Sequence, residues 1–401
     1  MAHNNNMNTK ALALLGLGHM MVDLNTGALP ALLPFLKTTL NLSYTMIGTV
    51  VLVASLSSSL IQPIFGHLSD RSARPWLLPF GVFAATCGMA AIGLAASYQT
   101  VLMLVCISGI GIASYHPEAY KTAYLATGEK KATGISLFSV GGNIGYGLGP
   151  LAVALCLTMF GQIGLLLLLL PGLLASGLLL WSLPWLSRTM SAQPTAAPVA
   201  TEETSSYAFL VVLGIVSLGA CVHGGLVTYV PLYFSARGEN PLVVGSLLSL
   251  LLIAGAIGTL IAGPLSDRIG HKKFLIFSMG VMCPLIALFL QTSGFTSMLV
   301  LTIIGMCISP IFSVTLVIAQ TLMRGRLGVT AGLMTGVGIG VGGLGVAVMG
   351  RIADLWGVES TMQLISIVPL LPWALVFLLP TTATRADTSL RGLRTATVEG
   401  K

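Results

Sequence analysis

Charged residues are scarce in this chain of 401 residues. Asp, Glu, Lys and Arg together make up 8% of the sequence and hydrophobic residues make up 55%, whereas about a quarter of a soluble domain is usually charged. So few charges cannot cover the surface of a water-soluble fold of this length. The composition therefore predicts a protein that is surrounded largely by lipid.

The motifs of common enzymes and pumps are also missing. The sequence has no glycine-rich phosphate loop ending in Lys-Ser or Lys-Thr, which disfavours ATP-driven transport, and it has no HExxH motif. Its six cysteines lie in apolar runs without CxxC spacing, so structural packing is a better interpretation than metal or redox chemistry. We therefore expect no enzyme activity, no cofactor and no metal site.

Long apolar runs dominate what is present. A helix needs about 20 apolar residues to cross a hydrocarbon core about 30 Å thick, and unpaired backbone is not tolerated there. The alternating ten-residue strands of a membrane barrel are absent. The sequence predicts an all-α membrane protein with twelve transmembrane helices, at 11–36, 44–65, 76–96, 100–120, 132–156, 163–186, 207–235, 242–264, 273–292, 297–322, 328–350 and 361–380.

The basic residues indicate the orientation of these helices. With the amino terminus inside, only Lys37, Arg237 and Arg351 of the nineteen Lys and Arg residues fall in outer connections. This distribution predicts a multi-pass protein of a bacterial inner membrane with both termini in the cytoplasm. The net charge of +7 then reflects topology, and we infer no nucleic-acid partner from it.

A polar stretch divides the chain near its midpoint. We expect a six-helix bundle at 1–186, a cytoplasmic linker at 187–206 and a second six-helix bundle at 207–380. The remaining residues, 381–401, are polar and basic, which predicts a disordered cytoplasmic tail. We expect the protein to act as a monomer.

A short charged segment occurs once in each half. Residues 66–71 read GHLSDR and residues 263–268 read GPLSDR, each after an apolar run and 197 positions apart. An Asp at the inner end of one helix can receive the positive end of a neighbouring helix and pair with Arg. We therefore interpret the repeat as a conformational latch formed by Gly66, Asp70, Arg71, Gly263, Asp267 and Arg268.

The repeated segment resembles the signature loop of the major facilitator superfamily, G-x-L-x-D-R-x-G-R/K-R/K. The second copy continues with Ile-Gly-His-Lys-Lys and is complete apart from the additional His271, whereas the first copy has Ala73 and Pro75 where the pattern has Gly and a base. The resemblance covers nearly the whole chain. It implies two pseudo-symmetric six-helix bundles that carry a small-molecule substrate by alternating access.

A narrower resemblance is carried by His19 and Asp23 in the first apolar run, the string Tyr115-His116-Pro117-Glu118 in the fourth, and Gln62-Pro63. These strings are similar to the fosmidomycin-resistance branch of the superfamily, which has a His-x-x-x-Asp pair in helix one and an aromatic-His-Pro-Glu string in helix four. The branch implies export of a small polar or drug-like compound, such as a phosphonate antibiotic, in exchange for protons.

The fifth apolar run contains a Gly-Pro element with Gly145, Gly149 and Pro150. The element resembles one associated with antiporters of the superfamily. Small residues also let helices approach closely and proline bends a helix, so close packing with no bearing on transport direction is an equal alternative.

Ionisable residues within the predicted spans are the candidates for proton coupling, because a charge in the bilayer needs a wet cavity or a partner. We select Asp23, Glu118, His19 and His116. His19 and Asp23 are four positions apart and share one helical face, where the carboxylate favours the protonated imidazole. His116 and Glu118 are expected to point to different sides of their helix, one into the cavity and one to a neighbour such as Lys121.

Other polar residues of the spans are candidates for the substrate cavity, namely Asn25, Asn143, His223, Tyr115 and Gln62. For all these residues the alternative is a buried polar tie between helices. Arg351 and Asp354, three positions apart, are expected to form a local pair at the outer surface. If their helix extends further than 328–350, Arg351 becomes a candidate for binding an anion.

The sequence thus predicts a proton-coupled exporter. An importer or uniporter of a small metabolite would share the fold and is the first alternative. A membrane-embedded enzyme or a sensor without transport activity is a remote alternative, because the sequence offers neither a clustered catalytic set nor an added soluble domain.

Overall fold

The computed structural model describes residues 7–71, 74–128, 130–190, 206–323 and 327–380. Most of the predicted linker and all of the predicted tail therefore lie outside the described residues. Within the described part, the first four positions assigned to the linker, 187–190, belong instead to the preceding helix.

The first half of the chain forms seven α-helices and three short helical turns. The α-helices are α1 (Thr9–Thr39), α2 (Tyr44–Ser55), α3 (Gln62–Arg71), α4 (Leu77–Ala91), α5 (Tyr98–Ala126), α6 (Lys131–Phe160) and α7 (Leu169–Met190). The turns are η1 (Leu56–Leu60), η2 (Ile92–Leu94) and η3 (Gln162–Leu168). The first two directly follow α2 and α4, and η3 directly precedes α7.

The second half is formed by α8 to α15. The helices are α8 (Ser206–Ala236), α9 (Pro241–Ile269), α10 (His271–Gly280), α11 (Met282–Gln291), α12 (Gly294–Ile308), α13 (Pro310–Leu322), α14 (Leu327–Ile367) and α15 (Leu370–Phe377).

The helical path is locally interrupted at several places, and three of these breaks have a clear chemical cause. Within the second span, η1 has π-helical geometry where the hydroxyl of Ser57 bonds back to the carbonyl of Val53 at 2.7 Å and competes with the backbone ladder. Pro310 starts α13 because proline has no N–H to donate to the preceding turn. Gly357 interrupts α14 with a φ of 86° that favours glycine.

The break at Gly357 also explains why the number of spans differs from the sequence prediction. The described residues contain 11 helical segments that are long and apolar enough to cross a membrane, against twelve predicted. The last segment, Gly332–Phe377, is 46 residues long and includes both of the final predicted spans. The connection between them is a bend in a nearly continuous helical path, which hydropathy alone interprets as a gap.

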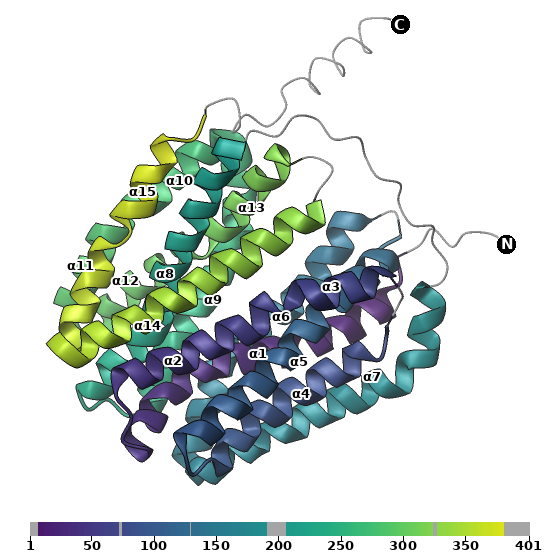
Figure 1. The fold of residues 1–401 in the computed structure, drawn as a ribbon, viewed down its shortest axis with the longest axis horizontal. Coiled ribbons are helices and arrows are strands. Elements are labelled where there is room, and N and C mark those ends of the chain that lie inside the picture. Colours follow the sequence, from purple (N-terminus) through teal and green to yellow (C-terminus); the bar gives the residue numbers. More distant parts are fainter. Residues whose placement is uncertain (1–6, 72–73, 129, 191–205, 324–326, 381–401) are drawn as a thin grey trace, which may run out of the picture.

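The helices form two groups, α1 to α7 and α8 to α15, which lie beside each other (Figure 1). The groups meet mainly where α2 packs on α14 and where α6 packs on α9. We call the end of the molecule that contains residues 66–71 and 263–268 the signature end. The end where α2 begins and α14 bends is the opposite end.

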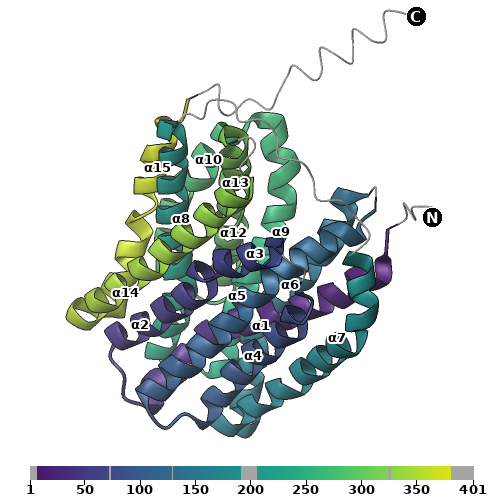
Figure 2. The same cartoon turned by 45° about the vertical axis from the view of Figure 1, so that its right-hand side comes forward.

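The two groups are close at the opposite end and diverge toward the signature end (Figures 1 and 2). Near the opposite end, the Leu151 N–H of α6 donates a hydrogen bond to the Ser249 hydroxyl of α9 at 3.1 Å. Nearer the signature end, the same two helices border a cavity of about 310 Å³, lined by Val140, Asn143, Ile144, Leu148, Ile253, Ala256, Ile257 and Leu260.

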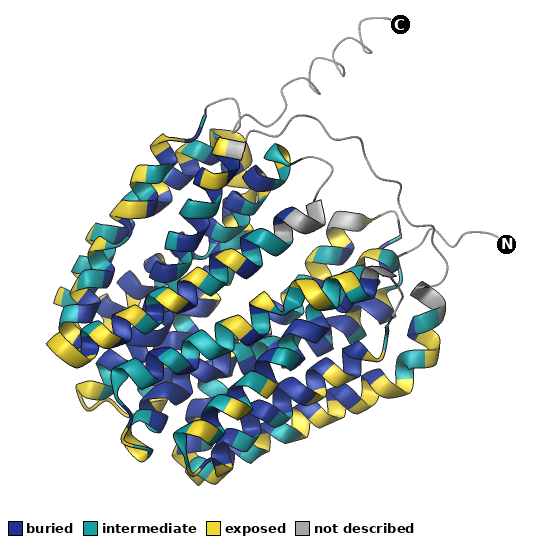
Figure 3. Cartoon of the chain, viewed as in Figure 1, coloured by how far each residue is buried: buried dark blue, intermediate teal, exposed yellow. Residues whose placement is uncertain are grey.

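Large apolar side chains are exposed on the outside of both groups, for example Phe295 at 81% and Trp181 at 78%. Figure 3 shows exposed residues along the outer side of α7 and at the bend of α14. Such a surface is stable only against hydrocarbon, since in water it would drive association. The protein is therefore a multi-pass membrane protein, and its buried core lies between the helices of each group.

Candidate functional site

The site begins on α1, where His19 and Asp23 project from successive turns. The Nε2 atom of His19 lies 3.2 Å from Oδ2 of Asp23, as expected for positions four apart on one helical face. Only 5% of the His19 side chain and 20% of the Asp23 side chain are exposed. This pair therefore lies inside the first helix group, with the carboxylate as its more accessible part.

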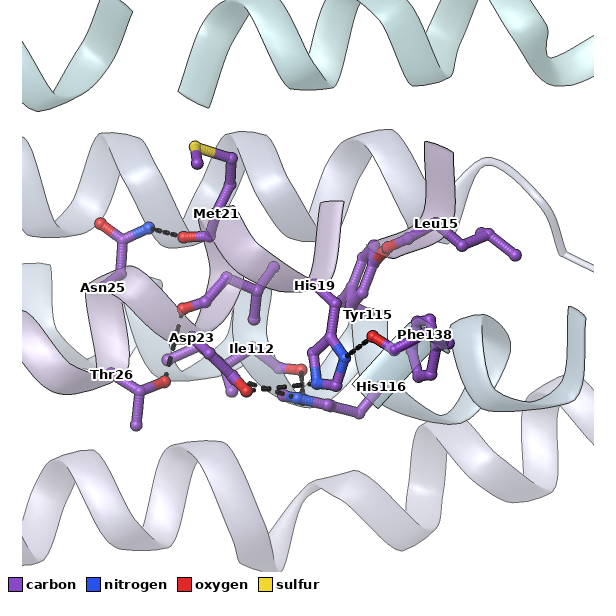
Figure 4. Close-up of polar contacts among 11 residues, drawn as sticks. Leu15, His19, Met21, Asp23, Asn25, Thr26, Ile112, Tyr115, His116 and Phe138 are labelled. Carbon is purple, nitrogen blue, oxygen red and sulfur yellow. Dashed lines mark hydrogen bonds and ion pairs between the residues drawn. The ribbon is translucent and has the colours of Figure 1, made fainter. Parts of the chain in front are cut away.

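A second imidazole reaches the same carboxylate from α5. The Nε2 atom of His116 lies 3.2 Å from Oδ1 of Asp23, and 14% of the His116 side chain is exposed. Figure 4 shows the two rings approaching Asp23, which thus binds one histidine through each oxygen. The contact between Asp23 and His116 joins α1 to α5.

The Nδ1 atom of each histidine ring faces a backbone carbonyl. Nδ1 of His19 lies 3.2 Å from the Phe138 oxygen of α6, and Nδ1 of His116 lies 3.0 Å from the Ile112 oxygen of its own helix (Figure 4). A carbonyl oxygen only accepts hydrogen bonds, so each Nδ1 carries a hydrogen. Both Nε2 atoms are then left to interact with the carboxylate.

This arrangement fixes how many protons the cluster needs. Each contact between an Nε2 atom and a carboxylate oxygen requires one proton to become a hydrogen bond, because both atoms are otherwise acceptors. With two protons among the three groups, both contacts are bonded and the cluster has a net charge of +1. Loss of one proton gives a net charge of zero and leaves an imidazole lone pair facing a carboxylate oxygen.

Aromatic packing and a glycine hold the cluster in place. The His19 ring stacks on Phe138 with a centroid distance of 4.4 Å and an interplanar angle of 17°. Gly142 of α6 lies next to the contact between His19 and Asp23. An added Cβ atom at this glycine would lie 2.5 Å from Nε2 of His19 and 2.7 Å from Oδ2 of Asp23. The position next to the cluster therefore has no room for a side chain.

The same three residues have the donor atoms that a metal ion would use. One ligand atom from each of His19, Asp23 and His116 can be chosen so that all lie within 4.8 Å of one another. The separations of 3.2 Å between the ring nitrogens and the carboxylate also fit direct hydrogen bonds. The three side chains could thus hold either protons or a metal ion between them.

Glu118 lies apart from this cluster, although it is only two positions from His116. Its fully buried carboxylate accepts a hydrogen bond from the Ser69 hydroxyl and another from the Arg74 N–H, the latter at 3.2 Å. Lys121 donates to the Ser69 carbonyl. His116 and Glu118 thus point to different sides of α5, as expected. Glu118 joins α5 to the end of α3 and to the segment that follows it.

Asn25 and Tyr115 are buried in helix contacts. Asn25 is 1% exposed, and its amide donates to the Met21 carbonyl at 2.7 Å and to the Thr86 hydroxyl at 3.3 Å. The Tyr115 hydroxyl donates to the Leu15 carbonyl at 2.5 Å, and this side chain is fully buried. Both residues join α1 to its neighbours, which corresponds to the alternative interpretation of a buried tie.

The other cavity candidates have different environments. Asn143 is exposed and lines the cavity between α6 and α9. His223 is partly exposed on α8 and forms no hydrogen bond or ion pair with any residue that the structure describes. Gln62 is partly exposed at the start of α3. Asn143 is thus the candidate that the structure places beside an open volume.

In the first signature segment, α3 extends to Arg71, and the side chains of Asp70 and Arg71 lie outside the described residues. An added Cβ atom at Gly66 would lie 3.9 Å from Pro117 of α5. The interactions that the structure gives for this segment are those of Ser69 with Glu118 and Lys121. Ser69 was not selected from the sequence, although it is the shared serine of the two copies.

In the second segment, the latch candidates are exposed at the end of α9, namely Gly263, Asp267 and Arg268. Asp267 lies 3.9 Å from Nε2 of His271, the additional residue of this copy.

Lys272 donates to the carbonyls of Phe377 at 3.1 Å and Leu379 at 2.5 Å, at the end of α15. This lysine thus neutralises the negative end of that helix.

The glycines of the Gly-Pro element lie where α6 crosses α1. Added Cβ atoms at Gly145 and Gly149 would collide with the backbone of α1 at Met20 and Leu24. Pro150 follows Gly149 directly, and its carbonyl oxygen lies beside Gly245 of α9. The element therefore serves close packing of α6 against helices of both groups.

The expected pair of Arg351 and Asp354 is not formed. No ion pair joins these residues among the described contacts, and Asp354 instead binds the start of α2 at Tyr44 and Thr45. The helix does extend beyond residue 350, up to the bend at Gly357, and Arg351 is exposed on it. Asp354 does not pair with Arg351 because the first turn of α2, from the other helix group, lies within reach of its carboxylate.

Comparisons with known proteins agree with this architecture. The chain is 31% identical over 373 residues to the fosmidomycin resistance protein of Escherichia coli (strain K12), with 92% of each chain covered. It is 31% identical over 383 residues to the uncharacterized MFS-type transporter YfnC of Bacillus subtilis (strain 168), again with 92% of each covered.

Solved structures show the same fold. A bacterial homologue of the human lysosomal transporter Spinster, in an inward-facing and occupied conformation, superimposes with a TM-score of 0.75 at 15% identity, covering 94% of this chain and 98% of that one. A D-xylose-proton symporter gives a TM-score of 0.70 at 14% identity, covering 93% and 98%. The family model described as Major Facilitator Superfamily matches residues 15–323 and 238–399. The chain is thus a transporter that belongs to the major facilitator superfamily.

Proposed function

We propose that the protein is a proton-coupled antiporter of a bacterial inner membrane that exports a small polar or drug-like compound. A phosphonate antibiotic such as fosmidomycin is the first candidate substrate, because a relative at 31% identity is named for resistance to it. The signature end faces the cytoplasm in this proposal, since 16 of the 19 basic residues are assigned to that side.

The observation that carries the proposal is the cluster of His19, Asp23 and His116. A carboxylate held between two imidazoles inside a membrane protein is costly, and ionisable residues in such places usually have a function. Proton loss removes one of the two hydrogen bonds at Asp23, and one of those bonds joins α1 to α5. If the lost proton is the one between Asp23 and His116, its loss weakens the contact between the two helices, which gives protons a means to influence the conformation.

Glu118 has a different role in this proposal. Its carboxylate is already bonded to Ser69 and to the backbone of Arg74, so it connects α5 to the first signature segment. We assign proton coupling to the cluster at Asp23 and a structural tie to Glu118. Asn143 is proposed to contact the substrate, because it contributes an amide to the otherwise apolar lining of the cavity between α6 and α9.

Transport into inverted membrane vesicles tests the proposal. Vesicles that contain the protein are given fosmidomycin and a panel of drugs and metabolites, with and without an imposed proton gradient. We expect gradient-dependent accumulation of one compound, and we expect Asp23→Asn to reduce it at least tenfold. Glu359→Gln is the matched control, because it removes an exposed carboxylate outside the cluster.

Three results would contradict the proposal. Accumulation that is equally gradient-dependent in Asp23→Asn and in the unmodified protein would remove the cluster from coupling. Accumulation in right-side-out vesicles alone would favour the importer. Export without any response to the gradient would identify a uniporter.

A further inference from the structure

The first turn of α2 contains backbone donors that its own helix cannot satisfy. The Ser43 hydroxyl accepts from the Met46 N–H at 3.1 Å, and the Ser43 carbonyl accepts from the Ile47 N–H at 3.1 Å. The N–H groups of Tyr44 and Thr45 remain, as expected at a helix start. They need acceptors from elsewhere in the molecule or from water.

Asp354 supplies these acceptors from the other helix group. Its Oδ1 accepts from the Tyr44 N–H at 2.7 Å, and its Oδ2 accepts from the Thr45 N–H at 2.8 Å and from the Thr45 hydroxyl at 2.5 Å. A carboxylate at this position also meets the positive end of the α2 dipole. One side chain of α14 thus completes the first turn of a helix in the other group.

The contact requires the two helices to be very close. An added Cβ atom at Gly350, one turn before Asp354, would collide with the Tyr44 carbonyl, and one at Gly48 would lie 2.8 Å from the Ala347 backbone. Glycine on both sides therefore lets α2 and α14 approach at the opposite end. When the groups separate there, the hydrogen bonds of Asp354 with Tyr44 and Thr45 are lost together.

We infer that Asp354 is a positioning residue of the transport cycle, a latch that stabilises the access state in which the opposite end is closed. It uses the physics expected of the signature aspartate, a carboxylate on a helix start, but at the other end of the molecule. Alternating access requires this end to open and close. Such a latch acts in the same way for either direction of transport and for any coupling ion.

Spin-label distance measurements test the latch on the full-length protein. One pair of labels at Leu137 and Leu260 reports on the signature end, and another at Met159 and Leu242 reports on the opposite end; all four side chains are exposed. The labels are introduced as cysteines after the native cysteines have been replaced. Measurements are made without substrate and at constant pH, so that a failure of the proton-coupled export proposal does not affect them.

We expect Asp354→Asn to move the ratio of opposite-end-closed to opposite-end-open molecules about tenfold toward open, which corresponds to about 1.4 kcal/mol. Glu359→Gln, which removes an exposed charge just beyond the bend at Gly357, is expected to leave the distances unchanged. Thr45→Val removes the hydroxyl bond alone and is expected to give a smaller shift in the same direction.

Identical distance distributions in Asp354→Asn and Glu359→Gln would overturn the inference. A monodisperse size-exclusion profile identifies variants that remain folded. If Asp354→Asn is not folded, Thr45→Val decides: a shift toward open at the opposite end supports the latch, and an unchanged distribution refutes it.

Discussion

Asp23 of α1 and His116 of α5 meet with 3.2 Å between a carboxylate oxygen and Nε2, and this contact connects two helices of the first group. His19 forms the equivalent contact with the other oxygen of Asp23, but within α1. The two imidazoles thus share one carboxylate, and of these two contacts only the one with His116 joins α1 to α5. Their replacement should therefore have different consequences.

We expect His116→Gln to impair proton-driven transport more than His19→Gln does. Both changes remove a titratable ring, but only the first removes the proton-dependent bond between α1 and α5. Gradient-driven accumulation should fall roughly tenfold or more in His116→Gln and less in His19→Gln. Initial rates measured in vesicles over a range of pH values provide the comparison. Equal losses in both variants would show that the bridge between helices has no special role.

Replacement of Gly142 by Ala should destabilise the protein. The added methyl group would overlap the His19 ring and the Asp23 carboxylate, and overpacking of this kind typically costs about 1–3 kcal/mol. Gly177→Ala in α7 is the matched control, since a Cβ atom there has no neighbour within 4 Å. The control should be neutral or slightly stabilising because alanine favours helices. Thermal denaturation in detergent, followed by size-exclusion chromatography, measures both.

Glu118→Ala should lower stability by about 1–3 kcal/mol, because it leaves buried donors at Ser69 and Arg74 without their acceptor. The residual transport of this variant should still respond to the proton gradient, unlike that of Asp23→Asn. Thermal denaturation and vesicle transport on the same preparations separate the two effects. A stable Glu118→Ala protein that has lost its gradient dependence would return Glu118 to the coupling site.

The membrane class, the two halves and the family could be predicted from the sequence because they depend on features that local chemistry fixes. Apolar run length sets the spans, and the repeat of Gly, Leu, Ser, Asp and Arg at identical offsets sets the signature segments. The spacing of His19 and Asp23 predicted their shared face, since four positions make about one helical turn. The opposite directions of His116 and Glu118 follow from the same periodicity.

The partners across helices could not be predicted in this way. His116 meets Asp23, Glu118 meets Ser69, and Asp354 meets Thr45 in place of Arg351. Each outcome depends on the rotation of two helices about their axes and on how closely glycines let them approach. Many weak packing contacts set those quantities together. The sequence by itself determined which residues are ionisable and which helix face bears them, whereas the tertiary structure decided which residues they meet.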